Sequence, residues 1–140
     1  MTKLLRTIFA WRQGAWGETC AAAHLKRNGM KIIGRNVRPS LMDRRYEIDL
    51  ICKSGDGSQI VFVEVKTHRT RSMFAPRLWK IDKRKKAAMH YACSSWLERA
   101  RWRGNYRFDV IEVYGDCLSD DDPEIDHIKN VPLFGRNRVG

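Results

Sequence analysis

Three acidic residues and one lysine lie in two short segments that are rich in branched apolar residues. The segments are Glu47-Ile48-Asp49-Leu50-Ile51 and Val61-Phe62-Val63-Glu64-Val65-Lys66. Side chains two residues apart on a strand share a face, so Asp49 accompanies Glu47, and Lys66 accompanies Glu64. Carboxylates at close range bind hard divalent cations, and a lysine stabilises negative charge on a phosphate. These residue types therefore indicate metal-dependent phosphate chemistry.

The two segments are predicted to pair as a β-hairpin. Asp56-Gly57 lies between them, and this dipeptide flanked by strand-forming residues is a strong hairpin signal. With these two as the loop residues, Asp49 faces Glu64 and Glu47 faces Lys66. The reverse face then carries only apolar side chains, namely Ile48, Leu50, Cys52, Val61, Val63 and Val65. One face is expected to be core and the other to carry the chemistry.

A Mg²⁺ or Mn²⁺ ion would suit this pair of acids. Carboxylates opposed on a sheet have Cβ atoms about 4.5–5.5 Å apart, and like charges at that distance are destabilising. A cation held by Asp49 and Glu64 removes the conflict and leaves coordination positions for phosphate and water, while Lys66 stabilises charge or orients the water. The structural alternative is a cross-strand ion pair between Glu47 and Lys66, with Asp49 a solvated carboxylate at a sheet edge.

The chain resembles the YraN-like family of small bacterial proteins, within the restriction-endonuclease-like, or PD-(D/E)xK, superfamily. Asp49 and the later Glu64-Val65-Lys66 are similar to the superfamily's acid and Glu-x-Lys signature. Further resembling segments occur between about residues 14 and 134, namely Gly17-Glu18, Gly29 to Arg38 with Arg35-Asn36, Phe62 to Thr67, Arg107-Phe108-Asp109-Val110 and His127-Ile128.

The resemblance implies a restriction-endonuclease-like α/β/α sandwich with a central mixed sheet of about five strands. It implies that Asp49 and Glu64 bind metal, assisted by the backbone carbonyl of Val65, and that Lys66 is catalytic. Glu18 matches an acidic residue that often completes such sites. Alternatively, Glu18 is a first-turn glutamate that interacts with the helix dipole. A single nuclease-like domain over 14–134 is expected, with an N-terminal extension over 1–13 and a loose tail over 135–140.

Positive charge is concentrated in the first 115 residues, which carry 24 basic and 10 acidic side chains, a balance of +14, whereas residues 116–126 hold six of the sixteen acids. A field of this sign attracts nucleic acid. The predicted nucleic-acid-binding residues are Arg69, Arg71, Arg77, Lys80, Lys83, Arg84, Lys85 and Lys86, with Trp79 as the candidate for stacking on a base. A solvated face is the alternative for the charges, and a core position is the alternative for Trp79.

Length and composition fit one domain, because 140 residues with 43% hydrophobic content can fill a core. No apolar run approaches the roughly 20 residues that span a bilayer.

The four cysteines lack disulfide or zinc spacing, so a cytoplasmic protein is expected. Residues 1–12 mix basic and apolar side chains, which fits either a frayed terminus or a short amphipathic helix that touches a membrane or partner.

The elements that must position the site follow from periodicity and breakers. Helices are predicted over about 14–28 and 82–101, the second capped by Asp82 and carrying an apolar stripe that includes Trp96. Strands are predicted over 31–38, 46–53, 59–67, 106–114 and 125–131. Residues 69–78 are expected to form a mobile basic loop.

Together these features favour a Mg²⁺- or Mn²⁺-dependent endonuclease that acts on DNA or structured nucleic acid. The alternative is a non-catalytic nucleic-acid-binding module with a nuclease-like fold. A third interpretation is an interaction protein whose acidic 116–126 segment docks a partner. The sequence does not determine whether the protein forms a homodimer. A branched DNA substrate would favour a dimer with two-fold symmetry.

Overall fold

The computed structural model describes residues 2–39, 46–70 and 83–133, and the structural statements below concern these residues. The elements in chain order are α1 (Lys3–Arg27), β1 (Lys31–Val37), β2 (Ile48–Lys53), β3 (Gln59–His68), α2 (Lys83–Ala100), β4 (Asn105–Tyr114) and β5 (Glu124–Ile128). The strands form one sheet in the order β1-β2-β3-β4-β5, in which β3 and β4 are parallel and the other neighbours are antiparallel.

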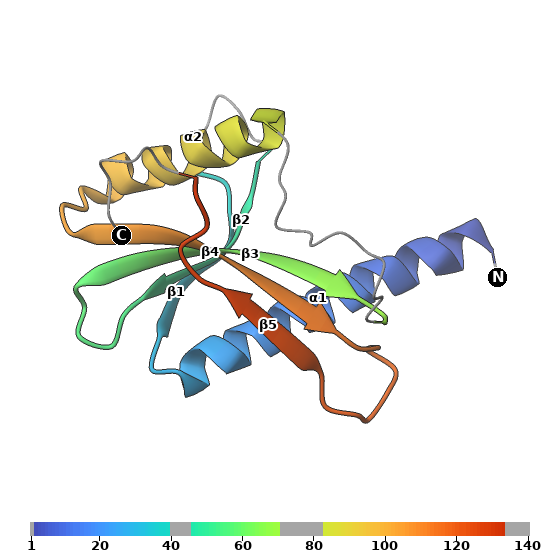
Figure 1. The fold of residues 1–140 in the computed structure, drawn as a ribbon. Helices are drawn as coiled ribbons and strands as arrows, with labels where there is room; N and C mark the ends of the chain where they lie inside the picture. The colour runs from blue at the N-terminus through green and yellow to red at the C-terminus, as the bar shows by residue number, and fades with distance from the viewer. Residues whose placement is uncertain (1, 40–45, 71–82, 134–140) are drawn as a thin grey trace.

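The two helices cover opposite faces of this sheet (Figure 1). Helix α2 connects the parallel strands β3 and β4 across one face, as such a pair requires. Helix α1 crosses the other face, and its N-terminal part continues past the strands (Figure 1). The fold is therefore an α/β/α sandwich around a mixed five-stranded sheet, which confirms the predicted fold class.

Both faces of the sheet are core, so the prediction of one apolar face and one chemical face was wrong. Phe62, which shares the face of Glu64, packs under α2 in a cluster with Ile51 and Met89. The other cluster joins α1 to residues that include Leu50 and Val63. Because helices cover both faces of the sheet, most side chains on both faces are buried in apolar clusters.

The predicted register of the β2–β3 hairpin is confirmed. Leu50 pairs with Val63, and Cys52 pairs with Val61. The turn is longer than the predicted two residues, because the last pair is closed by a 2.9 Å bond from the Ser54 N–H to the Gln59 carbonyl. Ile48 departs from the prediction and belongs to the cluster under α2, because regular pairing ends at Leu50.

Helix α1 begins much earlier than the predicted residue 14. Thr2 is its N-cap, and the Thr2 Oγ1 accepts a hydrogen bond from the Leu5 N–H at 3.2 Å. Residues 3–13 are therefore helical rather than frayed. Glu18 lies in the middle of the helix, so its interpretation as a first-turn glutamate was wrong.

Helix α2 buries the predicted apolar stripe against the sheet. Met89, Cys93 and Leu97 are buried, and the Trp96 ring packs edge-on against Phe62 with 5.7 Å between ring centroids. Neither helix of the described part is long and apolar enough to cross a bilayer. The predicted cap at residue 82, most of the predicted loop at 69–78 and the tail at 135–140 lie outside the described residues.

Candidate active site

The centre of the candidate site is the point where β2 and β3 stop pairing. Their regular register ends at Leu50 and Val63, and its continuation would pair Ile48 with Val65. Instead, the Val65 N–H donates a 2.8 Å hydrogen bond to Asp49 Oδ2. A carboxylate thus takes the place of a backbone acceptor, which satisfies a part-buried N–H and fixes the side chain between the diverging strands.

Glu64 lies beside Asp49 and is the most buried acid of the site, at 8% exposure. Its Oε1 is 3.3 Å from Lys66 Nζ and 3.5 Å from Lys85 Nζ of α2. The structural alternative required Lys66 to pair with Glu47. That alternative was wrong, because Glu47 Oε2 accepts from Arg38 at 3.0 Å.

Glu18 reaches the same place from α1 through Asn36 of β1. With its amide nitrogen facing the acids, Asn36 donates to Glu47 Oε1 at 2.7 Å and to the two Glu18 oxygens at 3.3 and 3.2 Å. Asn36 lies between residues 35 and 37, which pair with residues 50 and 48, so it is opposite Asp49. Its φ of 50° is left-handed, a conformation that asparagine adopts more readily than most residues.

Glu18, Glu47 and Asp49 form a carboxylate group that could hold a metal ion, since one oxygen of each lies within 4.8 Å of the others. The predicted ligand pair was Asp49 and Glu64. Asp49 is therefore common to the observed group and the predicted pair, and Glu64 adjoins it. Oxygen donors of this kind suit Mg²⁺, Mn²⁺ or Ca²⁺ rather than softer metals.

The acids of the site are electrostatically crowded. Burial, followed by repulsion from the Glu64 carboxylate, raises the pKa of Asp49 to about 8. Burial also raises the pKa of Glu18, although its hydrogen bond with Asn36 opposes the shift. Burial and the neighbouring Lys85 lower the pKa of Lys66. A divalent cation would relieve the repulsion between the carboxylates, so the donor set fits such an ion.

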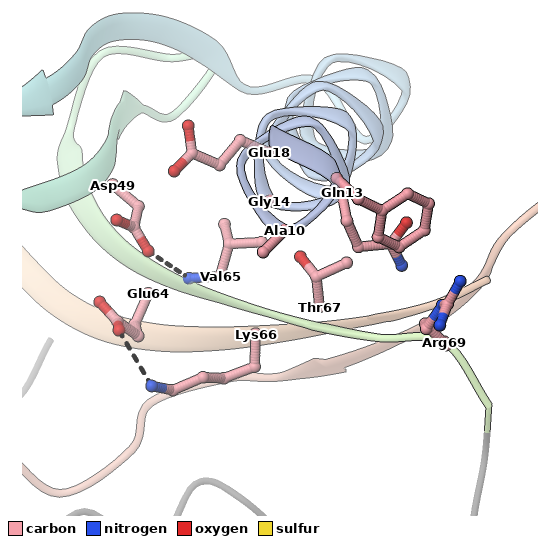
Figure 2. Close-up of a pocket in the computed structure, with 11 residues that line it drawn as sticks. Ala10, Gln13, Gly14, Glu18, Asp49, Glu64, Val65, Lys66, Thr67 and Arg69 are labelled. Atoms are coloured by element: carbon pink, nitrogen blue, oxygen red, sulfur yellow. Dashed lines mark hydrogen bonds and ion pairs between the residues drawn. The ribbon is translucent and has the colours of Figure 1, made fainter. Parts of the chain in front are cut away.

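Two hollows meet at Asp49 and Glu64. One, of about 550 Å³, lies under α1 and is also lined by Glu18 and Lys66; Figure 2 shows the carboxylates gathered at one end of it and Arg69 at the other. The second, of about 410 Å³, lies at the start of α2 and is also lined by Lys85. The two carboxylates thus form a ridge that is open on both sides.

Five of the predicted nucleic-acid-binding residues lie in the described part of the chain, and of these five only Lys85 forms an ion pair with an acid of the site, Glu64. Lys83, Arg84 and Lys86 occupy the same first turn of α2 and are exposed. The Arg69 guanidinium lies 4.3 Å from the centroid of the Phe9 ring and 3.7 Å from Asp116. The predictions for Arg71, Arg77, Trp79 and Lys80 fall outside the described residues.

The bridging role of Asn36 and the contact of Lys85 with Glu64 were not predicted, whereas Glu47 belonged to the predicted acidic group but not to the predicted ligand pair. The Arg35-Asn36 pair belonged to the family resemblance, but its relation to Asp49 depends on β1–β2 pairing. A separate polar network was also missed. Asp109 is fully buried, accepts from Arg107 and contacts His127 at 2.7 Å, and thereby ties β4 to β5.

Comparison with known proteins places the chain among uncharacterised relatives. A family model described as "Uncharacterised protein family UPF0102" matches residues 17–113. A UPF0102 protein of Geobacter sulfurreducens is 41% identical over 118 residues, covering 84% of this chain and 85% of the relative. A UPF0102 protein of Lawsonia intracellularis is 34% identical over 121 residues, covering 86% and 85%.

The solved structure of Pyrococcus furiosus SfsA in complex with Ca²⁺ is also similar. The TM-score is 0.34 at 14% sequence identity, and the match covers 86% of this chain and 63% of that chain.

Proposed function

The chain belongs to the uncharacterised protein family UPF0102, as its resemblance to the YraN-like family predicted, and we propose that it is a Mg²⁺- or Mn²⁺-dependent endonuclease of DNA or structured nucleic acid. The observation that carries this proposal is the convergence of Asp49, Glu64 and Lys66 where β2 and β3 diverge. Glu18 joins them from α1 and completes the proposed catalytic set.

Metal binding is assigned to Asp49, Glu64 and the backbone carbonyl of Val65, as the superfamily resemblance implies. Asp49 uses Oδ2 to accept from the Val65 N–H, which leaves Oδ1 for an ion. Glu18 and Glu47 lie close enough to Asp49 to add further oxygen donors. When bound, the cation supplies Lewis-acid stabilisation of the phosphate and a more acidic water.

Lys66 and Lys85 are proposed to act on the scissile phosphate. Both ammonium groups lie within 3.5 Å of Glu64 Oε1, so they border the carboxylates, and Lys66 also lines the hollow under α1. A positive charge held there stabilises the extra negative charge of the transition state. Because burial lowers the pKa of Lys66, that residue is also suited to exchange a proton with the attacking water.

The substrate backbone is proposed to cross the ridge between the two hollows. The first turn of α2 contains no acidic residue, and its lysines together with the positive end of the helix dipole favour a phosphate. Arg69 marks the opposite end of the hollow under α1. Arg71, Arg77, Trp79 and Lys80 remain proposed contacts in the segment that connects these two places.

Cleavage of labelled duplex, flap, four-way-junction and single-stranded substrates with Mg²⁺ or Mn²⁺ tests the proposal. Glu64→Gln and Lys66→Met should each lower the single-turnover rate by at least about 100-fold. The matched controls are Glu98→Gln and Lys26→Met, which change exposed residues of α2 and α1 and should cleave like the wild type. Intact substrates under all conditions would contradict the proposal.

A non-catalytic nucleic-acid-binding module is the second candidate. The double pairing of Glu64 with Lys66 and Lys85 favours it, because two ammonium groups can neutralise that carboxylate without a metal. Tight, salt-sensitive binding of nucleic acid without cleavage would select this candidate.

A further inference from the structure

Two surface features lie at the edge of the proposed nuclease site and contribute none of its acids. The first is the helical arm, defined as residues 3–12 of α1, which continues past the strands (Figure 1). Its Leu4 and Trp11 are 68% and 74% exposed, and Leu5 and Ile8 are also exposed. The second is the acidic loop, defined as residues 116–122 between β4 and β5, which presents Leu118 at 68% exposure and three consecutive exposed aspartates.

The helical arm exposes a stripe of apolar side chains. Leu4, Ile8 and Trp11 follow the spacing i, i+4, i+7, so they form one stripe along the helix. The first buried residue of α1 is Gln13, and a helix rises about 1.5 Å per residue, so the arm extends about 15 Å beyond that anchor. A solvated segment of this length is only marginally helical alone, and a partner on the stripe would stabilise it.

Charge identifies the partner. The arm carries Lys3, Arg6 and Arg12 with no acid, and the positive end of the α1 dipole adds to this charge. Lys3 and Arg12 form no ion pair with another described residue. An arm-to-arm contact between two copies would oppose like charges, so the arm requires an acidic surface that also exposes an apolar residue. The acidic loop, with Leu118 beside Asp120, Asp121 and Asp122, has both properties.

The acidic loop also disfavours an extended polyanion as the partner. Gln13 Nε2 donates to the Gly115 carbonyl at 2.6 Å, and the Cys117 N–H donates to Gln13 Oε1 at 2.9 Å. The base of the loop is therefore fixed beside the base of the arm. An anionic lipid surface or a nucleic acid that covered the arm would also approach the aspartates and be repelled by them.

We propose that the helical arm of one copy packs on the acidic loop of a second copy, and that a two-fold axis repeats the contact. Both patches lie at the same end of the protein, as an isologous interface requires. Leu4, Ile8 and Trp11 then meet Leu118, while Lys3 and Arg12 face the aspartates. This inference is independent of the proposed nuclease activity, because it concerns residues outside the acidic site.

Charge exchange between the patches tests this arrangement by sedimentation velocity of the full chain. The wild type should dimerise more weakly at higher salt, because screening shortens the range of the charges. The arm variant Lys3→Glu/Arg12→Glu and the loop variant Asp120→Lys/Asp121→Lys should each be monomeric. An equimolar mixture should form a heterodimer, because both of its arm–loop contacts are again complementary. All four positions are exposed, and circular dichroism verifies that the variants are folded.

Trp11→Ser should raise the dissociation constant of the dimer at least about tenfold, whereas Tyr91→Ser, at a 51% exposed position on α2, should leave it unchanged. A monomeric wild type, single variants that still dimerise, or a mixture that stays monomeric would each overturn the proposal. A monomer that binds anionic vesicles or duplex DNA through Trp11 would overturn it in favour of that partner. None of these outcomes is read from cleavage activity. A negative result for the dimer therefore does not contradict the proposed nuclease function.

Discussion

Asp49 accepts a hydrogen bond from the Val65 N–H at 2.8 Å where the pairing of β2 and β3 ends. The same carboxylate thus completes the sheet and forms the centre of the candidate site. Its position is fixed by the backbone, which is how a site achieves the preorganisation that metal-assisted catalysis needs. The cost is electrostatic, because burial and Glu64 raise the pKa of Asp49 to about 8.

Asp49→Asn should stabilise the metal-free protein at alkaline pH. The folded-state pKa of Asp49 is about 8, against 3.8 in the unfolded chain, so wild-type stability falls as pH rises between these values. Asparagine keeps an oxygen for the Val65 N–H but carries no charge. In urea unfolding with EDTA, the free energy of unfolding of the variant should exceed that of the wild type by about 1 kcal/mol or more at pH 9. This difference should shrink toward pH 4.

Asp56→Asn is the control of opposite sign for this measurement. Hydrogen bonds, first from the Ser58 N–H and then from Ser54, lower the pKa of Asp56 to about 2. The ionised carboxylate therefore stabilises the folded protein above about pH 4, and this stabilisation is lost in acid. The variant should therefore be no more stable than the wild type at pH 9. Destabilisation of metal-free Asp49→Asn at pH 9 would contradict the crowding of the carboxylates.

Asn36→Gly should weaken metal binding without unfolding the protein. Glycine accepts the left-handed backbone of this position but removes the amide that bridges Glu18 and Glu47. Losing a group that orients ligands typically costs about 10–100-fold in metal affinity, and titration calorimetry with Mn²⁺ measures it. Asn130→Gly is the matched control, since Asn130 also has a positive φ but lies elsewhere. Equal Mn²⁺ affinity in both variants would exclude the bridging role.

Lys85→Ala should slow cleavage more than Lys83→Ala. Only the former removes a charge that lies 3.5 Å from Glu64, so a loss of about 10²-fold in single-turnover rate is expected. Lys83 is an exposed neighbour in the same turn, and its removal should mainly weaken binding and reduce the salt dependence. If the two variants show the same loss of single-turnover rate at saturating protein, Lys85 does not stabilise the transition state more than Lys83 does.

Gly17→Ala should destabilise the packing of α1 on the sheet. A Cβ at this position would overlap the Thr67 side chain on β3, which forces the helix and strand apart at a cost of about 1–3 kcal/mol. Gly14→Ala in the same helix meets no atom within 4 Å and should stabilise by about 0.5–1 kcal/mol. Thermal unfolding of both variants checks the pair, and a neutral Gly17→Ala would show that the contact can relax.

The parts of the fold that depend on short-range pattern could be predicted from the sequence. Taking Asp56 and Gly57 as the loop residues predicted the hairpin register, and the alternation around Leu50 and Val63 supported it, because a slip of one residue would exchange the two faces. The stripe through Met89 and Trp96 similarly identified α2 and its buried side. The predicted start of α1 was wrong, because Gly14 and Gly17 resemble residues at a helix boundary. Gly17 instead lies in close contact with Thr67 of β3.

The site itself depended on contacts that the sequence leaves undefined. Asn36 lies opposite Asp49 only because β1 pairs with β2 in one register. Lys85 meets Glu64 only because α2 crosses the sheet with its first turn at the end of the paired strands. Ile48 changes face because the strands diverge after Leu50, an irregularity that strict alternation does not anticipate. The family resemblance included both Glu18 and Asn36 but did not indicate that they contact each other.

The most direct test of the central claim is the rate of cleavage as a function of divalent cation concentration, for the wild type and Asp49→Asn on the best substrate of the panel. The rate should saturate with Mg²⁺ or Mn²⁺, vanish in EDTA and be lost in Asp49→Asn, although this variant is folded and binds the substrate. Cleavage that persists in EDTA, or that proceeds equally fast in Asp49→Asn, would contradict a metal-dependent site centred on Asp49.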